Sequence, residues 1–301
     1  MNPDSITEED IEEYDLIEYF IEDMQAYGKS DSTVYEYERV VRDFDDFLDK
    51  HHARASRRDC MRYIGELRNR ELSSSSIATY ASYLHRFYSY LVKADEYPHT
   101  SNPMALVVEE MDEKIDKNPR RRELGVEDVI EFLKTVNHPR DRCMILMMFK
   151  TGIRAGELAN LRLEHISLSE DENREFGLGR NALLNPNSIL VSSDIEGNKR
   201  MRDTLVPVDD EMRRELVRWL RVRPETDTDA LFVSLSPSSS GSLSSEAVSS
   251  TMRKYTKKFG WWSADADLQQ NVTPHYCRHF FTTYLRESSG DDGLVKYLRG
   301  D

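Results

Sequence analysis

The spacing of apolar residues in the first hundred positions constrains the fold most strongly. In "SDSTVYEYERVVRDFDDFLDKH" they recur at steps of three and four, and "LSSSSIATYASYLHRFYSYLVKAD" repeats this pattern after a run of serines. Such spacing gives a helix one apolar face, and the serine or threonine before each run suits a helix N-cap. Two further helices are expected in "RDCMRYIGELRNREL" and "EEYDLIEYFIEDMQAYG". Short connections between the four predict a compact helical bundle.

The remainder of the chain has a mixed pattern. "GVEDVIEFLKTVN" predicts a short amphipathic helix, and the apolar "RDRCMILMMFKTG" predicts another that ends at Gly152, since glycine ends helices well. Residues 189–192 and 204–208 read as two strands around a polar turn. Helices are expected again in "DEMRRELVRWLRVR" and "SSEAVSSTMRKYTKKFG". We therefore predict a mainly α fold with a small antiparallel β-sheet.

A polar stretch divides the chain into two predicted domains. "DEKIDKNPRRRE" is charge-rich and contains a proline, as linkers between domains often do. The total of 301 residues allows two domains of ordinary size. We predict a helical domain at residues 1–111, a linker at 112–123 and a second domain at 124–301.

The charge is unevenly distributed. A net charge of -14 repels polyanions on average. Positive charge nevertheless gathers at residues 54–62, 120–122, 213–223 and 253–258. Any one of these clusters could be only a solvated face, so the sequence leaves their role open. The many acidic residues, together with more arginine than lysine, suggest the hypothesis that the protein is adapted to a cytoplasm with a high salt concentration.

Other features bear on the compartment and on cofactors. The three cysteines are an odd number without a close-spaced pair, which favours reduced thiols in the cytoplasm. No apolar run approaches the roughly 18 residues of a spanning helix, and the acidic N-terminus does not resemble a signal peptide. No glycine-rich phosphate loop or metal-ligand spacing is visible. We expect a cytoplasmic protein with no membrane contact, no cofactor and no metal.

Two separate motifs carry candidate catalytic residues. Arg154 lies in "TGIRAGEL", between two helical segments, and His275 and Arg278 form a His-x-x-Arg pair in "TPHYCRHFFTTYL". Two arginines and a histidine suit a phosphodiester, because each guanidinium can donate two hydrogen bonds to phosphate oxygens and stabilise added negative charge. Arg154 could instead simply pair with Glu157.

The predicted hairpin offers a fourth candidate. Lys199 lies near the hairpin tip in "EGNKRMRDTLVPV", where its ammonium group could protonate a leaving oxygen. An exposed hairpin lysine more often serves only solubility, and both interpretations stay open.

The order of these motifs resembles that of the tyrosine recombinases, which include phage integrases and Xer-type site-specific recombinases. The first third, with "STVYEYERVVRDFDDFL", "SSSIATYASYLHRFYSYLV" and "NPMALV", is similar to their DNA-binding core-binding domain, and the rest to their catalytic domain. The acidic composition points to a haloarchaeal member. The resemblance implies that Arg154 and Arg278 clamp the phosphate, that His275 assists proton transfer and that Lys199 is the general acid. The adjacent Arg200 leaves the register of the lysine open.

The nucleophile implied by the resemblance is a tyrosine shortly after a leucine-rich turn. Here that turn reads "YLRGD", with Asp301 where the family has histidine or tryptophan. We therefore expect the nucleophile to lie beyond the given sequence. Tyr297 precedes the turn, on a stretch whose apolar residues suggest a packed helix, so we do not expect it to be the nucleophile.

The resemblance implies site-specific DNA recombination, in which a 3'-phosphotyrosyl intermediate conserves the energy of the broken bond for rejoining. The implied partners are double-stranded DNA and further copies of the chain, as a dimer or tetramer on the DNA of the nucleoid. One alternative is a truncated, cleavage-inactive relative that only binds DNA or recombinase partners, which leaves enzyme activity of this chain uncertain. Another is a helical transcription regulator, which would explain the basic clusters but not the order of the motifs.

Overall fold

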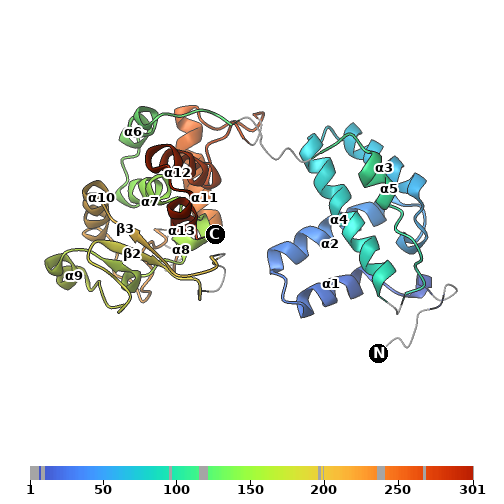
Figure 1. Ribbon diagram of the computed structural model, residues 1–301, viewed down its shortest axis with the longest axis horizontal. Coiled ribbons are helices and arrows are strands. Elements are labelled where there is room, and N and C mark those ends of the chain that lie inside the picture. Colours follow the sequence, from blue (N-terminus) through green and yellow to red (C-terminus); the bar gives the residue numbers. More distant parts are fainter. Residues whose placement is uncertain are drawn as a thin grey trace. The chain divides into compact units, whose positions relative to one another are not determined.

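The computed structural model describes residues 11–94, 97–114, 121–195, 200–235, 241–266 and 269–300, together with Thr7 and Asn198. The chain forms two compact units, Met1–Pro119 and Arg120–Asp301 (Figure 1). The predicted linker includes the division between the units, and residues 115–120 within it lie outside the described part.

The first unit is helical, as the apolar spacing predicts. Ser73 caps the longest helix, where its hydroxyl accepts a hydrogen bond from the Ser76 backbone at 3.2 Å. Phe44 and Phe87, from the two predicted apolar stripes, are fully buried, and Phe20 packs edge-on against Phe87 with ring centroids 5.4 Å apart. The helices are α1 (Leu16–Ala26), α2 (Asp31–Phe47), α3 (Arg57–Asn69), α4 (Ser74–Lys93) and α5 (Ala105–Glu110), with 3-10 turns at Ile11–Glu13 and His52–Arg54.

The second unit combines helices with a small sheet. Strands β1 (Ile166–Ser167), β2 (Ser188–Val191) and β3 (Thr204–Pro207) form an antiparallel sheet in that order. The helices are α6 (Val126–Lys134), α7 (Pro139–Thr151), α8 (Ala155–Ala159), α9 (Glu170–Phe176), α10 (Asp210–Leu220), α11 (Ser245–Phe259), α12 (Pro274–Ser289) and α13 (Asp292–Arg299), with a 3-10 turn at Leu163–His165.

The predicted fold class, mainly α with a small antiparallel sheet, is confirmed. The predicted hairpin is the pair β2 and β3, in which Ile189 lies opposite Val206. Strand β1 and helices α5 and α9 were not predicted. Strand β1 has too few residues to show alternation, and α9 has no buried residue and therefore no apolar stripe. Helix α9 is instead stabilised by a capping box, in which Ser169 and Glu172 satisfy each other's backbone N–H groups.

Helix α7 lies at the centre of the second unit and determines where the site begins. Its apolar residues are buried around most of its surface, which explains why the sequence shows no clear stripe. The helix ends at Gly152 in the left-handed conformation, with φ of 61°. A Cβ atom there would lie 2.6 Å from Cδ1 of Phe281 on α12, so only glycine fits. This turn leads directly to Arg154 at the start of α8.

Within the described ranges, no helix is long and apolar enough to cross a membrane.

Candidate active site

A cavity of about 420 Å³ opens on the second unit, and three of the predicted site residues line it together. Arg154 comes from the start of α8, and His275 and Arg278 from the first turns of α12. Arg253 of α11 and the following Trp262 also line the cavity. The fold thus brings together residues more than a hundred positions apart in the sequence.

Arg154 is oriented by a buried carboxylate. Its Nη1 lies 2.7 Å from Oε1 of Glu157, and its backbone N–H donates to Oε2 of the same residue at 3.1 Å. The Glu157 side chain is 1% exposed, whereas that of Arg154 is 31% exposed. The pairing that the sequence offered as an alternative therefore exists, and Arg154 faces the cavity as well.

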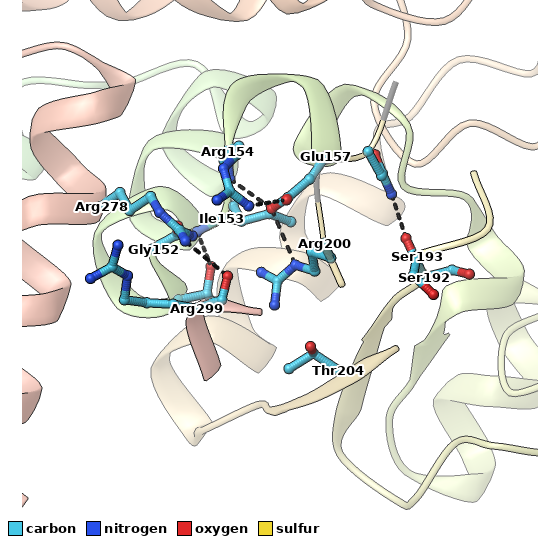
Figure 2. A network of polar contacts seen from close by, with 12 residues as sticks. Gly152, Ile153, Arg154, Glu157, Ser192, Ser193, Arg200, Thr204, Arg278 and Arg299 are labelled. Carbon is cyan, nitrogen blue, oxygen red and sulfur yellow. Dashed lines mark hydrogen bonds and ion pairs between the residues drawn. The ribbon is translucent and has the colours of Figure 1, made fainter. Parts of the chain in front are cut away.

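Arg278 is held by two backbone carbonyl groups. Its Nη1 donates to the oxygen of Gly152 and its Nη2 to that of Arg299, both at 2.9 Å (Figure 2). These two bonds fix the plane of a guanidinium that carries five N–H donors. The side chain is therefore anchored to the end of α7 and to the end of α13, while it contributes to the wall of the cavity.

His275 lies at the N-terminus of α12, which faces the same cavity. Thr273 caps this helix by accepting a hydrogen bond from the Tyr276 backbone at 3.3 Å. The pKa of His275 is lowered, first by partial burial and then by the positive charges of Arg121 and Arg278. The imidazole is thus biased towards its neutral form. A bound anion would offset the positive field and raise that pKa, and the helix dipole also favours an anion here.

Of the two hairpin candidates, Lys199 and Arg200, the structure describes only Arg200. Lys199 lies outside the described residues, as does Asp301 of the C-terminal turn. Arg200 is described, and its side chain is 0% exposed and paired with Glu157 at 3.2 Å. It does not line the cavity. Arg200 therefore lies behind Glu157, away from the cavity wall, and this position does not favour it as a general acid.

Tyr297 also lies away from the cavity. Its hydroxyl oxygen accepts a hydrogen bond from the Leu205 backbone at 3.3 Å, and the guanidinium of Arg202 lies 5.3 Å from its ring centroid. It belongs to α13, as the expectation of a packed helix implied. No tyrosine within the described ranges lines the cavity.

The sequence did not identify Trp262 as a site residue. The guanidinium of Arg253 lies 5.3 Å from a Trp262 ring centroid, and the ammonium of Lys257 lies 5.9 Å away, both within cation–π range. The basic segment at 253–258 is therefore continuous with the wall of the cavity. The only signal for Trp262 was its position shortly after that segment. In the part of the chain that the structure describes, no cluster of three metal-ligating side chains is present.

Comparisons with known proteins identify relatives for both units. The model of the phage integrase family matches residues 122–300, and that of its N-terminal SAM-like domain matches residues 16–97. The tyrosine recombinase XerC of Psychromonas ingrahamii is 30% identical over 242 residues, which cover 78% of this chain and 68% of the relative. The tyrosine recombinase XerA of Pyrococcus horikoshii is 25% identical over 292 residues, which cover 97% and 87%.

Solved structures agree at the level of the fold. The Tn1549 transposon integrase in complex with transposon right end DNA has a TM-score of 0.71 at 17% identity, with 95% of this chain and 90% of that chain covered. A lambda integrase dimer bound to a COC' core site has a TM-score of 0.69 at 14% identity, with 95% and 93% covered. The two family matches and these relatives show that the chain belongs to the phage integrase family of tyrosine recombinases.

Proposed function

We propose that this protein is a site-specific DNA recombinase that cleaves strands through a 3'-phosphotyrosyl intermediate and then rejoins them. The observation that carries the proposal is that Arg154, His275 and Arg278 line the same cavity. Its relatives named tyrosine recombinases support the same activity.

The chemistry assigns a role to each residue. Arg154 and Arg278 hold the non-bridging oxygens of the scissile phosphate and stabilise the charge that builds up in the transition state. His275 is close enough to their charges to respond to a phosphate, and we assign it the assistance of proton transfer. Lys199 protonates the 5' oxygen as it leaves. The nucleophile of such a reaction is a tyrosine, and no tyrosine within the described residues lines the cavity.

We propose a separate function for each of the two units. Residues 1–111 act as the core-binding domain and residues 124–301 as the catalytic domain, joined by the linker at 112–123. Together they bind double-stranded DNA, with α11 as one contact surface. We also propose self-association on DNA, which the lambda integrase dimer on its core site supports by analogy. The protein then works in the cytoplasm, at the nucleoid.

Duplex binding and covalent capture test this function. Affinity for a duplex should fall steeply with salt, with a log–log slope of about -0.9 per phosphate neutralised. With a nicked suicide substrate, the chain extended by any downstream coding sequence should form a phosphotyrosyl adduct, which mass spectrometry can map. In that version Arg154→Ala should leave duplex binding nearly intact and slow cleavage by about 100-fold or more. Absence of duplex binding at low salt would refute the proposal.

A second candidate is a cleavage-inactive relative that binds DNA or recombinase partners. The observation that favours it is the packing of Tyr297 away from the cavity. Duplex binding without an adduct from any version of the chain would support this candidate. An adduct that maps to Tyr297 would contradict the placement of that residue and make the chain itself the complete enzyme.

We further propose a haloarchaeal origin, supported by the net charge of -14. Such an acidic chain repels itself, and salt screens the repulsion. The free energy of unfolding should therefore rise between low and molar potassium chloride. A chain equally stable in both would argue against this origin.

A further inference from the structure

We propose that Arg200 is a positioning residue for the phosphate site: it balances the carboxylate of Glu157, so that Arg154 stays available to the phosphate. The proposal rests on the proposed function. It concerns a residue that does not line the cavity and therefore acts only through its neighbours.

The contacts of Arg200 place it directly behind Arg154. The Glu157 carboxylate lies between the two arginines, with Oε1 at 2.7 Å from Nη1 of Arg154 and Oε2 at 3.2 Å from Nε of Arg200 (Figure 2). The side chains of Arg200 and Glu157 are 0% and 1% exposed. Of these three residues, only Arg154, whose side chain is 31% exposed, lines the cavity.

The charges explain why the second arginine matters. A buried carboxylate with a single guanidinium partner forms a neutral pair, and it would compete with a phosphate for that guanidinium. With Arg200 as the second partner, the three groups carry one net positive charge, and the exposed member of the set is Arg154. The arrangement therefore places the excess charge where the proposed phosphate binds.

Arg200 also connects the hairpin to the end of α13. Its Nη1 donates to the Leu298 carbonyl at 3.0 Å, and the Met201 backbone N–H donates to the Gly300 carbonyl at 3.3 Å. A Cβ atom at Gly300 would lie 2.7 Å from Cδ of Arg200, so glycine leaves the space that the arginine occupies. The adjacent carbonyl, that of Arg299, holds Arg278. The last turn of α13 therefore fixes Arg200 and Arg278 together.

A double-mutant cycle on the 301-residue chain tests the charge balance. The variants are Arg200→Met, Glu157→Gln and the double variant, with Arg202→Met as a control on the same segment. The probe is inorganic sulfate, a tetrahedral dianion, with its affinity taken from the rise in unfolding temperature at constant ionic strength. Sulfate also stabilises proteins non-specifically, so each variant is compared with the wild type under the same conditions.

Arg200→Met should weaken sulfate binding about tenfold, the scale of one charge-assisted hydrogen bond. The double variant should restore the affinity to within about twofold, because no carboxylate is left to hold Arg154. Arg202→Met should leave it unchanged. A purely structural role for Arg200 would lower the unfolding temperature without this rescue.

Two results would overturn the proposal: a folded Arg200→Met chain with wild-type sulfate affinity, or a double variant as weak as Arg200→Met. Should Arg200→Met not fold, Arg200→Lys replaces it in the test. It keeps a charge beside Glu157 and should retain sulfate affinity, and a tenfold loss in a folded lysine variant would count against the charge argument. A wild-type chain that binds neither sulfate nor duplex would instead refute the proposed function.

Discussion

Replacement of Arg278 by alanine should destabilise the second unit, in addition to the proposed effect on phosphate binding. Two hydrogen bonds from a charged donor would be lost, to the carbonyls of Gly152 and Arg299. At about 1.5–3 kcal/mol each, their sum is roughly 3–6 kcal/mol. The removal of a guanidinium that is only 5% exposed also relieves its desolvation, and water in the adjacent cavity can solvate the carbonyls. We therefore expect a net loss of about 2–4 kcal/mol in the free energy of unfolding.

Urea denaturation followed by tryptophan fluorescence measures this loss in the relevant unit. All three tryptophans, Trp219, Trp261 and Trp262, lie in the second unit, so the signal reports on that unit alone. Arg154→Ala is the matched control. Its side chain is partly exposed, and Glu157 keeps Arg200 as a partner, so the cost should stay below about 1 kcal/mol.

Equal midpoints for Arg278→Ala and the wild type, at equal denaturant dependence, would refute the reasoning. So would an equal loss in the Arg154→Ala control, because burial and carbonyl anchoring would then not distinguish the two arginines.

Two further predictions concern the same region. Because the pKa of His275 is lowered in the free chain and a bound anion raises it, sulfate binding should take up a proton. Sulfate affinity should therefore increase as the pH falls through the window between the two pKa values, and a fluorescence titration of His275→Asn should show no such increase. Gly152→Ala should cost about 2 kcal/mol or more beyond Gly290→Ala in urea denaturation. Both glycines have positive φ, but only at Gly152 would the new Cβ collide with Phe281, so equal costs would contradict the close packing.

The sequence determined most of the helical architecture. The apolar residues of α2 and α4 recur at helical spacing, and residues three or four apart lie on one face of a helix whatever surrounds it. The hairpin of β2 and β3 was visible for a similar local reason. Helix α9 was not, because a capping box stabilises it without any buried apolar residue. Strand β1 forms through pairing with β2, a contact between distant positions that no local pattern records.

The candidate site divides in the same way. The sequence alone offered Arg154, His275 and Arg278 as candidates, because a guanidinium or an imidazole carries its chemistry wherever the chain places it. Only the tertiary structure decided that the three line one cavity, and that Trp262 joins them. The tertiary structure also showed that Arg200, which is adjacent to Lys199 in the sequence and was therefore a second candidate for the general acid, is buried. Its side chain is buried because the end of α13 and Glu157 enclose it, and burial of a charge depends on partners that only the folded chain brings within hydrogen-bonding distance.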